Sequence, residues 1–211
     1  MRPAKLLARC VRCGAAEKRC ICASTTSLET KAKVVVVMHV FELKKPSNSA
    51  RLLPVCLENA EVLVRGEKDR PMSTESLEDP DRELWVLFPS DDSVPLTPEL
   101  VAQAQKPITL VVPDGTWPQA RRIPNRVKPL KNAKRVRLAE EAAATMRLRH
   151  HPDPLRMSTA EAVGRALTII EGPEAGAHVL DTFHRFATKL LEARGTIPRT
   201  DISDEGDDDS E

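Results

Sequence analysis

The chain has 211 residues, of which 41% are hydrophobic, so it can form a core of ordinary size. Aromatic residues make up only 3% and Tyr is absent, so this core must be built from Val, Leu, Ile and Ala. The net charge is +1, but the last eleven residues hold seven acids, and the rest of the chain carries 32 Lys and Arg against 24 Asp and Glu. A basic body favours a polyanionic partner, and an acidic tail is typical of a disordered, solvating segment.

Two observations argue against a membrane or secreted protein. The longest apolar run, residues 34–38, is far too short to span a bilayer. The first ten residues contain no apolar region of the kind found in secretory signals. We therefore expect a cytoplasmic protein with no membrane partner.

Four of the five cysteines lie close together near the N-terminus, with the spacing Cys10-x2-Cys13-x6-Cys20-x-Cys22. Four thiolates can close a tetrahedral site, for which Zn²⁺ is the usual ion, and such closed sites are normally structural. Two disulfides are the alternative, which the absence of secretory features disfavours. The spacing predicts a small N-terminal zinc knuckle.

Short apolar or β-branched runs alternate with helical patterns along the rest of the chain. Strands are predicted over residues 33–40, 61–65, 84–89, 108–113 and 134–138. Helices are predicted over 49–59, over 97–105, from near Pro118, from Ser158 onward and over about 174–194, and the polar segment 66–83 is expected to be a loop. This alternation indicates an α/β fold with a mostly parallel sheet and flanking helices. Ligands of such sheets bind beyond the carboxyl ends of the strands.

One strand ends abruptly at Asp114-Gly115-Thr116-Trp117. A turn followed by a helix start at Pro118 explains the acid, the glycine and the proline. It does not explain a tryptophan at a strand end in a chain with so few aromatics. A functional loop explains all of them, with the acid as base or acceptor and the indole as a stacking face. No G-x-G-x-x-G motif is present, so a Rossmann-type nucleotide site is not expected.

Basic residues gather after this loop. Eight occur in seventeen residues without an acid: Arg121, Arg122, Arg126, Lys128, Lys131, Lys134, Arg135 and Arg137. A solvated charged surface is the common meaning of such a run, but its single sign beside a candidate site favours contact with nucleic-acid phosphates. A second basic cluster, residues 147–156, leads into Ser158-Thr159-x-Glu161, which has the spacing of a capping box. A helix start also offers N–H groups to an anion.

These motifs together resemble the DTW-domain family, whose signature is Asp-x-Thr-Trp. The similarity includes the cysteine cluster, residues 39–42 (HVFE), residues 48–53 (NSARLL), residues 87–90 (LFPS) and residues 158–162 (STAEA), in the order typical of the family. Ser49 stands where the family usually has Thr, and it keeps the hydroxyl. The acidic tail is not part of the family signature.

The resemblance implies an enzyme that transfers the 3-amino-3-carboxypropyl group of S-adenosylmethionine to N3 of a tRNA uridine and releases methylthioadenosine. It also implies a SPOUT-like and possibly knotted domain, which we place at residues 31–197, after a zinc-binding segment at 1–30 and before an acidic tail at 198–211. Two alternatives stay open: a non-catalytic, zinc-containing RNA-binding module, and the same transfer to rRNA. tRNA is the expected partner, and no stable protein partner is expected.

The resemblance and the residue chemistry suggest a role for each motif. Asp114 is the candidate general base for the uridine N3 proton. The residues expected to contact S-adenosylmethionine are Leu87, Phe88, Pro89, Pro113, Gly115, Thr116, Trp117, Ser158, Thr159, Glu161 and Ala162. The residues expected to contact RNA are His39, Asn48, Arg51, Arg121, Arg122, Arg126 and Arg149. The expected metal ligands are Cys10, Cys13, Cys20 and Cys22.

Overall fold

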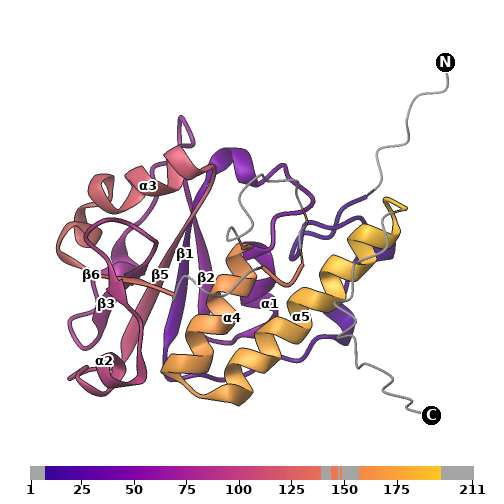
Figure 1. Cartoon of the computed structure of the whole chain (residues 1–211). Helices are drawn as coiled ribbons and strands as arrows, with labels where there is room; N and C mark the ends of the chain where they lie inside the picture. Colours follow the sequence, from indigo (N-terminus) through magenta and orange to yellow (C-terminus); the bar gives the residue numbers. More distant parts are fainter. Residues whose placement is uncertain (1–7, 139–143, 147, 149–156, 196–211) are drawn as a thin grey trace, which may run out of the picture.

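A parallel β-sheet forms the centre of the molecule (Figure 1). The structure is a computed structural model, and it describes residues 8–138, 144–146, 148 and 157–195. The strands are β1 (Lys33–His39), β2 (Ala60–Arg65), β3 (Glu83–Leu87), β4 (Val94–Pro95), β5 (Ile108–Asp114) and β6 (Lys134–Arg137). Their order is β2-β1-β5-β3-β6-β4, and every neighbouring pair is parallel. The predicted α/β class and the five predicted strands are confirmed.

Five α-helices flank the sheet. They are α1 (Leu53–Cys56), α2 (Pro98–Ala102), α3 (Trp117–Arg126), α4 (Thr159–Ile170) and α5 (Pro173–Glu192). Among the described residues, no helix is both long enough and apolar enough to cross a bilayer. The start of α4 agrees with the sequence prediction, because the Ser158 hydroxyl accepts a hydrogen bond from the Glu161 N–H.

Two elements differ from the prediction. The helix expected over 49–59 is a 3₁₀ turn at Ala50–Leu52 followed by the four residues of α1. It ends because Leu57 is extended and forms a parallel bridge with Leu28, which directs the chain into β2. The two-residue edge strand β4 was not predicted, since a proline-containing pair has no readable periodicity.

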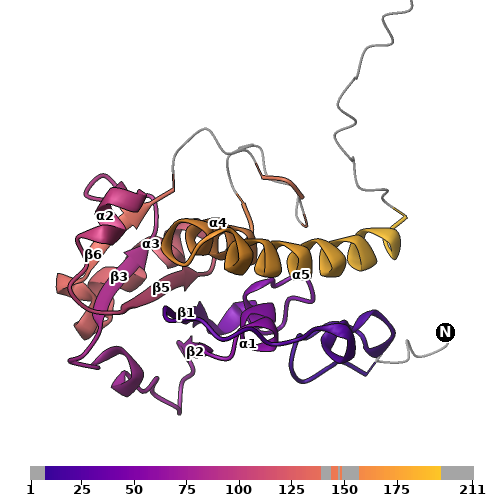
Figure 2. The same cartoon turned by 90° about the horizontal axis from the view of Figure 1, so that it is seen from below.

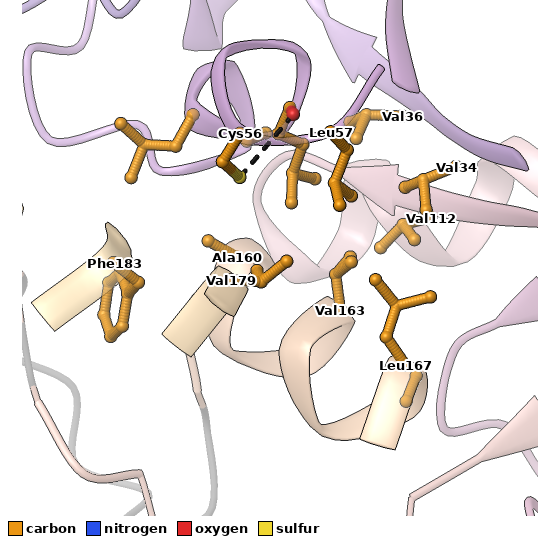
Figure 3. Close-up of a cluster of buried hydrophobic side chains, with 14 of the residues drawn as sticks. Val34, Val36, Cys56, Leu57, Val112, Ala160, Val163, Leu167, Val179 and Phe183 are labelled. Atoms are coloured by element: carbon orange, nitrogen blue, oxygen red, sulfur yellow. Dashed lines mark hydrogen bonds between the residues drawn. The ribbon is translucent and has the colours of Figure 1, made fainter. Parts of the chain in front are cut away.

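Both faces of the sheet are covered, which explains the continuous apolar runs of its central strands. Side chains alternate along β1, so that Val34 and Val36 join one core and Val35 and Val37 join the other. The larger core lies between the sheet and the helices α1, α4 and α5 and includes Val112, Ala160, Val163, Leu167, Val179 and Phe183 (Figure 3). The smaller core lies under α3 and includes Val111, Ala120 and Ile123. β5 therefore lies at the centre of the fold, with all seven of its residues buried.

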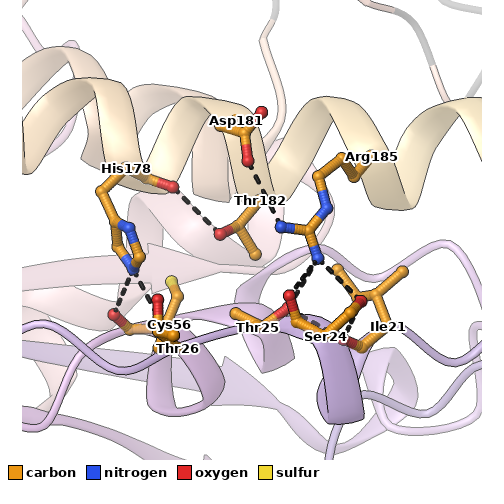
Figure 4. Close-up of polar contacts among 9 residues, drawn as sticks. All are labelled: Ile21, Ser24, Thr25, Thr26, Cys56, His178, Asp181, Thr182 and Arg185. Atoms are coloured by element: carbon orange, nitrogen blue, oxygen red, sulfur yellow. Dashed lines mark hydrogen bonds and ion pairs between the residues drawn. The ribbon is translucent and has the colours of Figure 1, made fainter.

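The N-terminal segment packs against the C-terminal half of the chain. Arg185 of α5 donates to the Ser24 carbonyl oxygen at 2.8 Å and to the Ser24 hydroxyl at 2.9 Å, as Figure 4 shows. His178 Nε2 lies 3.1 Å from the Thr26 carbonyl oxygen and 3.0 Å from that of Cys56. Figure 2 shows the N-terminal segment beside the far end of α5. Cys13, Ala15 and Ile21 belong to the same core as the sheet.

Helices α4 and α5 approach each other most closely at two glycines. A Cβ added at Gly176 would lie 2.7 Å from the Gly164 carbonyl oxygen, and a Cβ added at Gly164 would lie 2.8 Å from Leu180 Cγ. Both distances are shorter than real Cβ contacts. The glycines therefore set the distance between the two helices that cover the larger core.

We expect Gly176→Ala to destabilise the protein by about 2 kcal/mol, a decrease in Tm of roughly 4–8 °C. The added methyl group meets first the Thr168 side chain and then the Gly164 carbonyl oxygen, a backbone atom that cannot move aside, and this cost exceeds the roughly 1 kcal/mol that alanine gains in helix propensity. Thermal unfolding followed by circular dichroism measures the change. Ala177→Gly, at the exposed neighbouring position, is the control for propensity alone. A Gly176→Ala protein as stable as the wild type would contradict the close contact.

Candidate active site

The Asp114 carboxylate lies at the carboxyl end of β5 and is 7% exposed. Asn48 Nδ2 donates a hydrogen bond to its Oδ2 at 2.7 Å. Thr159 Oγ1 donates to its Oδ1 at 2.5 Å. A buried carboxylate requires such donors, because burial removes its hydration. Three segments far apart in the sequence therefore meet at this side chain.

Residues 42–49, between β1 and α1, are themselves held in place. Glu42 is 1% exposed, and its Oε2 accepts a hydrogen bond from Asn48 Nδ2 at 3.4 Å. Its Oε1 pairs with Lys45 Nζ at 2.5 Å. The Ser49 hydroxyl accepts from the Ala160 N–H at 3.1 Å, which joins this segment to the start of α4. The Asn48 amide nitrogen thus donates to both Glu42 and Asp114.

Asn48 is only 3% exposed. The structure places its amide against the Asp114 carboxylate, and the RNA contact expected for it stays a prediction. Glu42 was not among the predicted site residues. In the sequence, Glu42 is an acid close to the end of a buried strand, and the polar residue Asn48 follows six positions later. That pattern becomes informative only when the fold brings both residues beside Asp114.

The turn after Asp114 leads directly into α3. Thr116 is the N-cap, and its N–H donates to Gln119 Oε1 at 2.9 Å. A Cβ at Gly115 would lie 3.1 Å from Gln119 Cβ and 3.4 Å from His39 Cβ, so a larger residue would push against both. The helix-cap explanation of this sequence is therefore correct for Thr116, and Asp114 itself is not the cap.

Trp117 is 37% exposed and lies against Phe88, with ring centroids 4.8 Å apart and planes tilted by 38°. Phe88 follows β3 and is 7% exposed, while Pro89 is exposed. Leu87 and Pro113 are buried in their strands. The Trp117 indole at the start of α3 thus packs against the end of β3 and stays partly exposed next to the turn that follows Asp114.

Glu161 is fully buried, and its carboxylate is occupied by contacts within the protein. Its Oε1 accepts from the Thr145 N–H at 2.7 Å and the Thr145 hydroxyl at 3.0 Å, and it pairs with Arg165 at 2.8 Å. Its Oε2 is buried and has no hydrogen-bond partner among the described residues. Ala162 is half-buried one residue further along α4. Glu161 therefore holds Thr145 in place.

Exposed arginines line the outer surface of α3. A surface hollow of about 390 Å³ is bordered by Trp117, Pro118, Arg121, Arg122, Asn125 and Arg126. Other basic residues between positions 121 and 137 have partners within the protein. Arg135 pairs with Asp92 at 2.9 Å, and the Lys134 ammonium lies 4.5 Å from the Trp85 ring centroid. Arg149 lies outside the described residues.

The remaining predicted RNA residues lie at two places. His39 ends β1, next to Gly115. Arg51 Nη2 donates to the Val11 carbonyl oxygen at 2.6 Å, and its guanidinium lies against Gly14. Arg51 thus contacts the loop between Cys10 and Cys13.

The four N-terminal cysteines form one group, with Sγ atoms all within 4.8 Å of one another. Two pairs, Cys10 with Cys22 and Cys13 with Cys20, are each 3.8 Å apart. A tetrahedral site with metal–sulfur bonds of about 2.3 Å has sulfur–sulfur distances of about 3.8 Å, so the group fits a metal ion. All five cysteines are free thiols, which excludes the disulfide alternative in this structure.

The surroundings of the thiols differ. Burial raises the pKa of Cys13 and Cys22. Burial also acts on Cys10, but hydrogen bonds from the backbone N–H groups of Cys13 and Arg12 and from the thiols of Cys20 and Cys22 together outweigh it and lower the Cys10 pKa to about 6. Burial raises the pKa of Cys56 to about 12, which makes this separate thiol inert at neutral pH. Its Sγ lies 3.7 Å from the Leu53 carbonyl oxygen (Figure 3).

Comparison with known proteins identifies the family. Residues 7–191 match the DTW domain model, so the chain belongs to the DTW domain family. It is 29% identical over 168 residues to tRNA-uridine aminocarboxypropyltransferase 2 of Drosophila melanogaster, covering 76% of this chain and 65% of that protein. It is 26% identical over 177 residues to the protein of the same name from Macaca fascicularis, covering 80% and 58%. The chain thus spans less than two thirds of the length of these relatives.

A solved structure has a similar fold. It is the SAM-dependent rRNA:acp-transferase Tsr3 from Vulcanisaeta distributa, with a TM-score of 0.52, 21% sequence identity, and coverage of 77% of this chain and 79% of that one. The family assignment and the SPOUT-like fold class expected from the sequence are confirmed. The knot and the domain boundaries stay predictions.

We expect the purified protein to hold about one metal ion per chain, because the four sulfur atoms already have the spacing of a metal–thiolate site. Elemental analysis of protein purified under reducing conditions measures the metal content. Cys10→Ser should lose the ion and lower the Tm. Cys56→Ala, which removes a thiol outside the group, should keep it. A folded wild-type protein with four free thiols and no metal would contradict this assignment.

Proposed function

We propose that this protein transfers the 3-amino-3-carboxypropyl group of S-adenosylmethionine to N3 of a uridine in tRNA and releases methylthioadenosine. The observation that carries the proposal is the Asp114 carboxylate, fixed by Asn48 and Thr159 at the carboxyl edge of the sheet. The names of the relatives and of the structural neighbour support the same chemistry.

Asp114 acts as the general base in this proposal. Uridine N3 is a poor nucleophile while it carries its proton, and the carboxylate takes that proton as N3 attacks. The new bond joins N3 to the γ-carbon of the methionine moiety. The bond between that carbon and sulfur breaks, and its electron pair stays on sulfur, which becomes the neutral thioether of methylthioadenosine. Attack at this carbon rather than at the methyl group requires close positioning of both substrates.

The residues around Asp114 supply that positioning. Asn48 and Thr159 hold the base itself, so we assign Asn48 to the orientation of Asp114 in place of an RNA contact. The half-exposed Trp117 ring offers a stacking face for adenine or uracil. Thr116 and the polar start of α4 at Ser158 lie on segments joined to Asp114, where they suit the amino-acid end or the ribose of S-adenosylmethionine.

The arginine-lined hollow on α3 suits the phosphate backbone of the RNA. It begins at Trp117 and continues along Arg121, Arg122 and Arg126, so positive charge leads directly to the stacking face. Phosphate contacts give affinity and orientation without sequence selection. We assign the four-cysteine site to structural Zn²⁺, the usual ion for four thiolates, which would cross-link the N-terminal loops and take no part in the transfer.

A non-catalytic RNA-binding module is the competing function. It has no use for a buried carboxylate with two dedicated donors at a strand end. Incubation of tRNA with S-adenosylmethionine labelled in its carboxypropyl carbons, followed by mass spectrometry of the nucleosides, tests the proposal. A labelled uridine supports it, and unlabelled tRNA with labelled rRNA would reassign the substrate. No transfer to either RNA would contradict it.

Asp114→Asn should lower the rate of transfer by about 10²–10⁴, the usual effect of losing a general base. The amide has nearly the shape of the carboxylate but cannot take the proton. Thr159 can still donate to the amide oxygen, and a flipped Asn48 offers its buried Oδ1, which has no partner among the described residues. Single-turnover transfer measures the rate, and thermal unfolding with calorimetric titration of S-adenosylmethionine checks folding and cofactor affinity.

Asp69→Asn, at an exposed loop position, is the matched control and should transfer normally. A near wild-type rate for Asp114→Asn would show that the general-base assignment is wrong.

The triple change Arg121→Ala, Arg122→Ala and Arg126→Ala should weaken tRNA binding and flatten its salt dependence. An arginine that neutralises a phosphate releases counterions, so the slope of log K against log salt should become shallower by about one for each such arginine removed. Fluorescence anisotropy at several salt concentrations measures both quantities. The triple change Lys31→Ala, Lys106→Ala and Lys189→Ala removes equal charge elsewhere, and equal effects of the two triples would contradict a specific RNA surface.

A further inference from the structure

The chain has six Phe and Trp residues, and two of them have a large exposed fraction. Phe41 is 64% exposed and Trp117 is 37% exposed. The other four, Trp85, Phe88, Phe183 and Phe186, are buried. Trp117 already belongs to the proposed site, and nothing in the transfer reaction described above uses Phe41.

Phe41 lies at the same edge of the sheet as Asp114. It is in the turn that follows β1, and Met38 of β1 is the register partner of Asp114 in β5. His39 contacts Gly115, the residue after Asp114, because a Cβ on that glycine would lie 3.4 Å from His39 Cβ. Figure 1 shows that β1 ends at the end of the sheet where α3 begins. The two exposed aromatic residues therefore lie on neighbouring strand ends around the candidate base.

The position of Phe41 is fixed by its neighbours. Its N–H donates to His39 Nδ1 at 3.3 Å, and the two rings are 5.0 Å apart with planes tilted by 54°. On its other side His39 faces Gly66 after β2, where an added Cβ would lie 3.8 Å from Nε2. An aromatic ring held in this way loses little conformational freedom when a flat ligand stacks on it.

Basic side chains lie near Phe41. Glu42 is the one acid between Phe41 and Leu57, and it is buried and paired with Lys45. Lys44 is exposed, and Arg65 is the register partner of His39. A single exposed aromatic ring beside basic side chains does not resemble a protein–protein interface, which needs a larger buried area with an apolar centre. A stacking face beside positive charge is the combination that binds unpaired nucleotides.

We propose that Phe41 is a stacking platform for a nucleobase of the RNA substrate that lies next to the target uridine. The inference rests on the proposed function, since it takes tRNA as the substrate. Base–aromatic stacking tolerates every base, so Phe41 would hold the strand in position without selecting its sequence. Together with Trp117 it would hold an unpaired segment on both sides of Asp114.

Phe41→Ala should weaken tRNA binding about 5- to 150-fold, the range expected for losing one stacked base. The salt slope should stay unchanged because no charge is removed, in contrast to the arginine triple. Phe41→Leu keeps an apolar side chain without a ring face, so it should bind tRNA nearly as weakly as Phe41→Ala does. Phe41→Trp should bind like the wild type. Anisotropy with tRNA at fixed salt measures affinity, and all three variants should keep the wild-type Tm because Phe41 is exposed.

The affinity for S-adenosylmethionine, measured by calorimetry, should be the same in every variant. Wild-type affinity of both Phe41→Ala and Phe41→Leu for tRNA would overturn the inference, and so would a loss of S-adenosylmethionine affinity with unchanged RNA binding. These outcomes leave the proposed function intact if the wild type labels tRNA. If the wild type labels no RNA but its tRNA binding depends on Phe41, the proposed function fails and the stacking platform stands.

Discussion

The burial of the Asp114 carboxylate is the constraint on which the rest of the site depends. A charge removed from water is costly unless hydrogen-bond donors replace its hydration. The donors come from Asn48 and Thr159, on two segments far apart in the sequence. Because each donor must itself be held still, Glu42 orients Asn48, and Ser49 accepts from the first turn of α4. The hydrogen bonds that the buried carboxylate requires therefore explain how the residues around Asp114 are arranged.

Much of the fold could be predicted from the sequence, because it depends on patterns among residues that are close together in the chain. The central strands are continuous apolar runs because both faces of the sheet are covered, and residues 34–37 alternate between two cores. The capping spacing at Ser158 places the start of α4 correctly. The cysteine spacing identifies a group of ligands because they are close together in the chain.

Long-range contacts explain where sequence reasoning fails. The helical pattern over residues 49–59 is interrupted by a bridge between Leu57 and Leu28, which no local periodicity records. Asn48 reads as a surface polar residue until the fold brings it to an acid 66 positions later in the chain. Phe41 follows an apolar strand and looks like its continuation, although the 3₁₀ turn at Val40–Glu42 leaves it exposed. Thr159 and Ser158, in contrast, were expected near the site because the family signature includes them.

The same kind of contact connects the site to the N-terminal segment. Glu161, two residues after Thr159, holds Thr145, and the Thr145 hydroxyl lies 2.9 Å from His184 Nε2 on α5. The next residue of α5, Arg185, holds the Ser24 carbonyl oxygen two residues after the last cysteine of the metal group. Helix α5 therefore contacts both the segment before α4 and the loop that the metal would cross-link. A metal ion held by the four cysteines would stabilise the surface on which α5 docks, and through the α4–α5 packing it would support the helix start that supplies Thr159 to Asp114. The four-cysteine group is thus connected to Asp114 through contacts of helices α5 and α4.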